Sequence, residues 1–87
     1  MPEISRFFGI IIKMFFLDHA PPHFHAEYGS NKAVIDISSK EVVEGYLPPT
    51  QLKLVQAWAI IHEDELLLNF NNLNMDNPNW KKIEPLK

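Results

Sequence analysis

The sequence predicts an α+β fold, in which an antiparallel meander sheet of about four strands is covered on one face by one long amphipathic helix. In the first half of the chain, short runs of alternating apolar and polar residues lie between turn residues, as is typical of strands. From residue 51 to about residue 73, apolar residues instead recur every three or four positions, which indicates one helical face. We expect residues 1–87 to form a single domain, with residues 74–87 as a tail or an edge strand.

The first apolar run, residues 4–17, is expected to form one long strand or two strands broken at Gly9. Its β-branched and aromatic residues favour a strand over a helix. From Phe7 to Leu17 it is apolar on both faces apart from Lys13, which suggests a central strand or a contact with a second copy of the chain. The apolar stretch from Phe7 to Leu17 is about half as long as a membrane span and Lys13 interrupts it, so we expect neither a transmembrane helix nor a signal peptide.

Three shorter strands are expected next, at residues 23–28, 32–37 and 41–47. Short polar turns at residues 29–31 and 38–40 join them, which favours an antiparallel meander. Pro48, Pro49 and Thr50 then end the sheet and begin the helix. Either Pro49 takes the first helical position or Thr50 caps the helix.

One face of the predicted helix is expected to be buried against the sheet. Its positions are Leu52, Val55, Ala59, His62, Leu66, Phe70 and Leu73, widened by Trp58, Ile61 and Leu68. The asparagine-rich segment 69–79 is expected to fray the helix, which then ends at Asn77 and Pro78. Residues 80–83 follow as a final edge strand or as a tail held by Trp80.

The composition excludes several classes of protein. A net charge of −3 and a pI near 5.7 argue against a strongly basic nucleic-acid-binding protein. The chain has no cysteine, which excludes a disulfide framework and a thiolate metal site. We expect a cytoplasmic protein without a membrane partner.

Candidate functional residues are concentrated between Asp18 and Tyr28, where three of the four histidines fall within seven residues. Side chains alternate between the two faces of a strand, so His23, His25 and Glu27 share one face. If the opposite, more apolar face packs on the helix, these side chains lie on the open face of the sheet with Lys13, Asp36 and Glu44. In the reverse orientation, the two histidines lie beside His62. The sequence is compatible with both orientations.

One hypothesis for this segment is a metal site. His23 and His25 on one strand face can both bind a divalent ion such as Zn²⁺, with His62, His19 or Glu27 completing the ligand set. The contrasting interpretation is a purely structural ladder of polar side chains across the sheet. His62 and Glu63 do not begin a zincin motif, because Leu66 stands where the second histidine is required.

A second hypothesis is acid–base catalysis, with His23, His25 and His62 as candidate catalytic residues. Asp18 or Glu27 would hold a histidine as general acid or base, as in ribonucleases that need no metal, and His19 would support the site. Lys13, Arg6 and Lys32 are the nearby candidates for binding phosphate.

Several segments carry a family resemblance: ISRFFGI at residues 4–10, DHAPPHFHAEY at 18–28, AVIDI at 33–37, EGYLP at 44–48, WAIIHEDEL at 58–66 and KIEPL at 82–86. With these segments the chain resembles the small bacterial proteins grouped as domain-of-unknown-function family 4160, and only the asparagine-rich segment before Trp80 departs from the pattern. Members tend to be encoded beside another very small protein, in arrangements like toxin–antitoxin pairs. The resemblance therefore implies a cytoplasmic protein partner, and it implies that His19, His23, His25 and His62 act together.

The leading functional hypothesis is a protein-binding component of a two-gene, toxin–antitoxin-like system. Such a protein would bind a small protein encoded by a neighbouring gene, or form a homodimer, through its exposed sheet face or an edge strand. The alternative is a toxin-like ribonuclease or other phosphodiesterase, with nucleic acid as substrate and a divalent metal such as zinc as candidate cofactor. A DNA-binding regulator is disfavoured, because the sequence has neither helix-turn-helix spacing nor a basic recognition helix.

Overall fold

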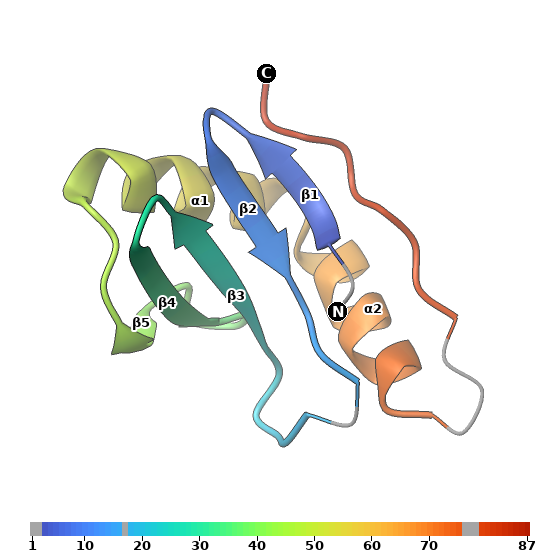
Figure 1. The fold of residues 1–87 in the computed structure, drawn as a ribbon. Helices are drawn as coiled ribbons and strands as arrows, with labels where there is room; N and C mark the ends of the chain where they lie inside the picture. Colours follow the sequence, from blue (N-terminus) through green and yellow to red (C-terminus); the bar gives the residue numbers. More distant parts are fainter. Residues whose placement is uncertain (1–2, 17, 76–78) are drawn as a thin grey trace.

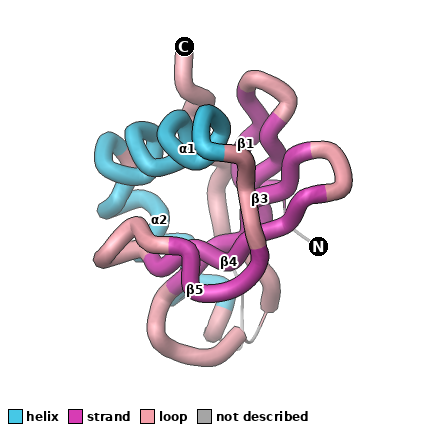
Figure 2. Tube along the Cα trace, turned by 90° about the vertical axis from the view of Figure 1, so that its left-hand side faces the viewer, coloured by secondary structure: helices cyan, strands magenta, loops and turns pink. Residues whose placement is uncertain are grey.

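The computed structural model describes residues 3–16, 18–75 and 79–87, and these form two layers. One layer is a five-stranded antiparallel sheet and the other holds two helices, which both lie behind the sheet (Figure 1) and on one side of it (Figure 2). The strands follow one another across the sheet in chain order. Their bounds are β1 (Glu3–Phe7), β2 (Ile10–Lys13), β3 (His23–Tyr28), β4 (Asn31–Asp36) and β5 (Val42–Gly45), and the helices are α1 (Pro49–Ile61) and α2 (Glu63–Leu73). The predicted α+β meander is confirmed.

The first apolar run forms two strands broken at Phe8 and Gly9, which confirms the second of the two predicted alternatives and raises the strand count from about four to five. Phe8 and Gly9 both have positive φ, 49° and 77°, and they join Phe7 to its partner Ile10. Two such residues make a type I′ turn, whose twist matches that of the flanking strands. The turn separates two neighbouring phenylalanines, because Phe7 is buried with Ile10 while Phe8 is 59% exposed.

The predicted long helix is divided at His62, and this prediction is therefore corrected. His62 leaves the helical conformation, with φ −112° and ψ 24°, and lies between α1 and α2. Glu63, Asp64 and Glu65 consequently occupy the first turn of α2, where the helix dipole favours negative charge. Pro49 begins α1, as one of the two predicted starts requires.

The core lies between the helices and the sheet, and Trp58 is its largest fully buried side chain. The indole ring lies 5.3 Å from the ring of Phe7 and 6.0 Å from that of Phe24. Its Nε1–H donates to the Glu84 carbonyl at 2.8 Å, so the indole has the polar partner that a buried tryptophan requires. Ile61 and Leu68 do not widen the buried stripe as predicted, because they are 66% and 59% exposed.

Asn69 is buried and fixes the segment after the helices, instead of fraying the helix as predicted. Its side-chain amide donates to the Lys81 carbonyl at 2.7 Å and accepts the Lys81 N–H at 3.0 Å. The Ile83 N–H then donates to the Ile4 carbonyl at 2.9 Å. The segment of residues 79–87 therefore runs beside β1 as an extended tail (Figure 1), and it is not a regular strand.

The helix ends at Leu73, whereas the predicted end at Asn77 and Pro78 lies outside the described residues. Neither α1 nor α2 combines the length and apolar character that crossing a membrane would need.

Candidate functional site

The histidines of β3 lie on the open face of the sheet. Phe24 and Ala26 are fully buried beneath the helices, and alternation therefore turns His23, His25 and Glu27 to the other side. This is the first of the two orientations that the sequence allows. In the ladder, His25 stands between Lys13 of β2 and Val34 of β4, and His23 stands opposite Asp36.

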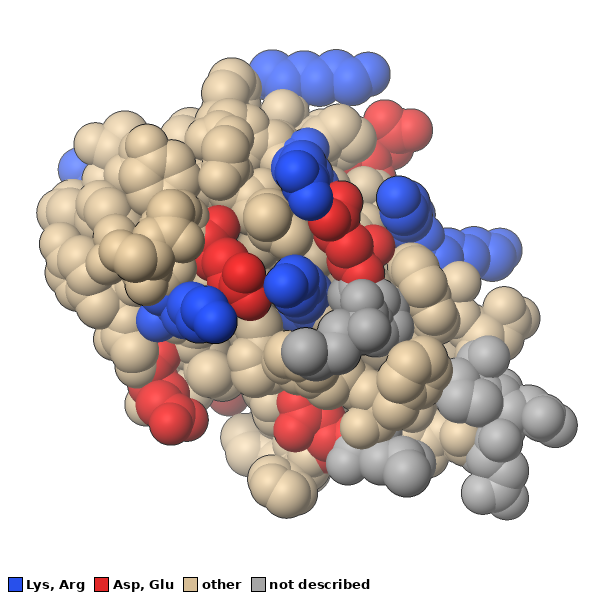
Figure 3. All heavy atoms as spheres, in the orientation of Figure 1, with Lys and Arg blue, Asp and Glu red and all other residues tan. Residues whose placement is uncertain are grey.

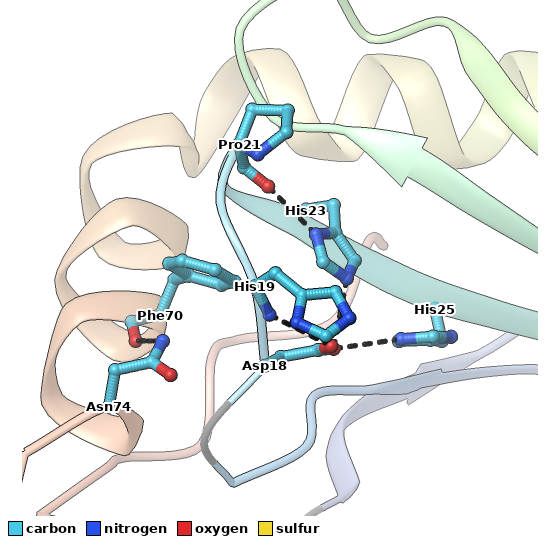
Figure 4. Close-up of polar contacts among 7 residues, drawn as sticks. All are labelled: Asp18, His19, Pro21, His23, His25, Phe70 and Asn74. Atoms are coloured by element: carbon cyan, nitrogen blue, oxygen red, sulfur yellow. Dashed lines mark hydrogen bonds and ion pairs between the residues drawn. The ribbon is translucent and has the colours of Figure 1, made fainter.

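The loop between β2 and β3 brings Asp18 back to these histidines. Its carboxylate oxygen Oδ2 lies 2.9 Å from His23 Nε2 and 3.3 Å from His25 Nε2 (Figure 4). The other oxygen, Oδ1, accepts the His19 backbone N–H at 3.2 Å. Burial alone would raise the pKa of this carboxyl. The hydrogen bonds from His25 and His23 and the charge of His23 outweigh that effect and lower the pKa, so Asp18 is an anion near neutral pH.

His23 lies between two acceptors. Its Nδ1 is 2.8 Å from the Pro21 carbonyl oxygen, while its Nε2 faces Asp18 (Figure 4). A neutral imidazole carries one N–H and one lone pair. With a neutral ring, one of these two contacts would therefore place a lone pair against an oxygen. A cation at Nε2, either a second proton or a metal ion, resolves this conflict and leaves Nδ1–H donating to Pro21.

His25 is held against an aromatic ring. The ring of Phe15 lies 4.2 Å from the imidazole at an interplanar angle of 85°. Burial lowers the pKa of His25 below its ordinary value, although the hydrogen bond to Asp18 acts in the opposite direction. The neutral ring, which is the form that binds metals, is therefore favoured at His25.

A hollow of about 330 Å³ opens beside the cluster. Asp18, His23 and His25 line it together with two further carboxylates, Asp36 and Glu44, and the described residues that line it include no lysine or arginine. A second hollow of about 320 Å³ lies on the other side of His25, against Phe15, Glu27 and Lys32. Acidic and basic side chains are interspersed on this face of the molecule (Figure 3).

Two candidate phosphate-binding cations already have acidic partners. Lys13 Nζ lies 3.3 Å from Glu27 Oε2, and Arg6 Nη2 lies 2.7 Å from Glu3 Oε1. Lys32 stands opposite Glu27 in the ladder between β3 and β4. The predicted supporting residues Lys13 and Glu27 are therefore one ion pair beside the cluster.

The structure does not bring His62 into this cluster. His62 packs on Trp58 in the helix layer, with a ring separation of 5.6 Å, and its Nδ1 lies 2.6 Å from Glu65 Oε1. The predicted joint action of His62 with the histidines of β3 therefore has no geometric basis, because the sheet lies between them. His19 lines the hollow, but it lies outside the group of close ligand atoms formed by Asp18, His23 and His25.

Sequence reasoning missed three neighbours that shape the cluster. They are the Pro21 carbonyl, the ring of Phe15, and the ring of Phe70, which lies 5.5 Å from that of His23. The two prolines of the loop were a signal that the chain returns sharply after Asp18. Phe70 comes from α2 and is distant in sequence, so only the tertiary fold shows its position.

Comparison with protein families gives a match to the family described as a domain of unknown function (DUF4160), over residues 9–71. The matched range contains every candidate site residue from Lys13 to His62. No match was found among curated proteins or among solved structures. Because the match spans well over half of the 87 residues, the chain belongs to the DUF4160 family, as its sequence resemblance predicts.

Proposed function

We propose that the protein is the protein-binding component of a two-gene, toxin–antitoxin-like bacterial system, and that the open face of its sheet binds a small partner protein. The observation that carries this proposal is the one-sided sheet. Both helices cover the face that holds Phe24 and Ala26, while the other face carries two adjacent hollows that share His25. A concave face between well-packed strands is a suitable surface for a partner segment.

The chemistry of the hollow beside Asp18 favours a basic partner segment. Three carboxylates line it, from Asp18, Asp36 and Glu44, and exposed Val43 lies at its edge beside half-buried Val34. A lysine or arginine side chain can place its charged end near the carboxylates and its aliphatic stem on the two valines. Complementary charge of this kind mainly gives specificity and fast association.

Charge reversal on this face tests the proposal. The protein is co-expressed with the small protein encoded beside it, and the dissociation constant of the purified pair is measured by titration calorimetry. Glu44→Lys should weaken binding at least about tenfold, because it places a cation against the basic segment. Glu84→Lys makes the same charge change on the exposed tail and should leave the dissociation constant within about twofold.

Failure of the pair to form a complex would overturn the proposal. Equal weakening by both substitutions would show that net charge, and not the open face, controls binding. Both substitutions are at exposed positions, so the free energy of unfolding of each variant should stay close to that of the native protein.

A second candidate function is a histidine-dependent, metal-assisted ribonuclease or phosphodiesterase. The close arrangement of Asp18, His23 and His25 favours it, because such a group can hold a metal or transfer a proton. The hollow beside these residues has no lysine or arginine among its described lining residues, so a metal ion would have to supply the positive charge that phosphate requires. Both proposals assume a cytoplasmic protein.

Colony formation after induced expression tests the second candidate. The native chain should arrest growth, and the double variant His23→Ala/His25→Ala should restore it at equal soluble expression. The purified native protein should cleave RNA and the double variant should not. His62→Ala should retain activity because His62 lies in the helix layer. Normal growth with the native chain, together with intact RNA, would eliminate this candidate and leave the binding proposal unaffected.

A further inference from the structure

We propose that Asp18, His23 and His25 form a three-ligand site for a divalent transition-metal ion, with Zn²⁺ as the first choice. This inference goes beyond the proposed partner binding and does not depend on it. The three side chains are each partly exposed to the same hollow, so an ion among them could exchange with solvent and keep a coordination position open.

The positions of the ligand atoms suit a tetrahedral ion. Zn²⁺ binds imidazole nitrogen and carboxylate oxygen at about 2.0–2.2 Å, which separates neighbouring ligand atoms by roughly 3.3–3.5 Å. Asp18 Oδ2 lies 2.9 Å from His23 Nε2 and 3.3 Å from His25 Nε2, and one ligand atom from each of the three residues lies within 4.8 Å of the other two. The two distances from Asp18 are therefore close to those of a tetrahedral zinc site.

The contacts of His23 suit a metal ligand. Its Nδ1 lies 2.8 Å from the Pro21 carbonyl oxygen and can donate to it, so Nε2, which lies 2.9 Å from Asp18 Oδ2, is the nitrogen that can bind an ion. A metal ion would then be bound by both Nε2 and Oδ2. A backbone carbonyl that fixes the distal ring nitrogen is also the usual outer-shell partner of a metal-binding histidine.

The surrounding charges agree with a bound cation. Asp36 and Glu44 line the hollow as well as Asp18, whereas Lys13, the ladder partner of His25, is paired with Glu27. Two imidazoles and one carboxylate are a donor set that favours zinc and related first-row ions over Mg²⁺ or Ca²⁺, which prefer oxygen ligands. A water molecule or a partner group in the hollow would complete the coordination.

Titration of the purified, metal-free protein with Co²⁺ and Zn²⁺ alone tests the site. We expect one ion per chain, and we expect the visible absorption of Co²⁺ to show four- or five-coordination. Asp18→Asn, His23→Ala and His25→Ala should each weaken Zn²⁺ binding by at least about 100-fold, because each removes a ligand. His19→Ala is the matched control from the same loop, and it should change the affinity by less than about threefold.

The nitrogen chemical shifts of the histidine rings provide a readout that needs no variant. In the native protein, Zn²⁺ should shift His23 Nε2 and His25 Nε2 to values typical of metal-bound nitrogen, while His62 stays unchanged. A His23 ring that carries two protons and does not respond to Zn²⁺ would overturn the proposal, since the cation at Nε2 is then a proton. A loss of affinity in His19→Ala as large as that in His23→Ala would overturn the three-ligand composition.

The metal titration involves neither partner nor RNA. A chain that binds Zn²⁺ but neither binds a partner nor cleaves RNA would therefore contradict the proposed functions alone. A chain that binds its partner but does not bind Zn²⁺ would contradict this inference alone.

Discussion

Asp18 and His25 make the folded, metal-free protein sensitive to acid. Burial lowers the pKa of His25 below 6.5. As the pH falls, His25 is therefore protonated in the unfolded chain before it is protonated in the folded chain, and the free energy of unfolding declines below about pH 6.5. The pKa of Asp18 is lowered below 3.8 although burial acts against this, because His25 and His23 stabilise the anion. The contribution of Asp18 to stability is complete above the unfolded-state pKa of 3.8 and is lost as the pH falls through the lower, folded-state pKa.

We therefore expect the free energy of unfolding to fall in two steps as the pH is lowered, the first beginning near pH 6.5 and the second near pH 3.8. Urea unfolding at a series of pH values, with a chelator present, measures it. His25→Gln should flatten the upper step, and His19→Gln, the exposed control, should not. Parallel curves for His25→Gln and the native protein between pH 7 and pH 5 would refute the assignment to His25.

Ser5 offers a simple gain in stability. Its hydroxyl is buried and has no hydrogen-bond partner among the described residues. An unpaired buried hydroxyl is costly, so Ser5→Ala should raise the free energy of unfolding by about 1 kcal/mol. Urea denaturation tests this, with Ser30→Ala in an exposed turn as control. A destabilised Ser5→Ala protein would show that the hydroxyl has a partner after all.

At the residue scale, the sequence could place the histidines relative to one another but not within the fold. The alternation of side chains along a strand predicts that His23 and His25 share a face, and they share one in the structure. Which face they occupy depends on the burial of Phe24 and Ala26 beneath the helices, which is a tertiary property. Because β3 turns its histidines away from the helices, His62 is separated from the cluster. The local sequence does not indicate this separation.

Among the elements, β5 depends on a single glycine. Gly45 has φ +80°, and a Cβ at this position would lie 2.1 Å from the Lys32 carbonyl oxygen, which also accepts the Tyr46 N–H at 2.9 Å. The conflict is with backbone, so β5 would have to shift. Gly45→Ala should therefore destabilise the protein by about 3 kcal/mol.

Gly29→Ala is the matched control for this prediction. Its φ is also positive, +59°, but no atom lies within 4 Å of the added Cβ, so its cost should be about 1 kcal/mol. The midpoints of urea unfolding compare the two variants. Equal midpoints would mean that positive φ alone, without the clash at Lys32, determines the cost.

The elements also show where sequence patterns lose information. Gly9 marks a break in the first apolar run, which the sequence offers as one of two alternatives, but the exact turn is hard to predict because a phenylalanine such as Phe8 rarely adopts positive φ. The division at His62 has no glycine or proline to mark it. The acidic run at residues 63–65 indicates a helix start, but it also suits the exposed face of a continuous helix.

For the molecule as a whole, metal binding should be visible as stability. An ion that binds only the folded chain adds about 2.7 kcal/mol at a free concentration one hundred times its dissociation constant. Zn²⁺ should therefore raise the melting temperature of the native protein, and a chelator should reverse the increase. His23→Ala should show no such response, whereas His19→Ala should respond fully. A melting temperature of the native protein that ignores Zn²⁺ would contradict the prediction.

The tail beside β1 limits how the molecule can assemble. It bonds to Ile4 and follows that edge of the sheet, whereas β5 has no strand beyond it in the described part of the chain. Exposed strand edges are the places where sheets of separate molecules join. Two copies that join through β5 would each have used their one open edge, so growth stops at a closed pair. Without the tail, each copy would offer two open edges, and the same pairing could continue into a fibre.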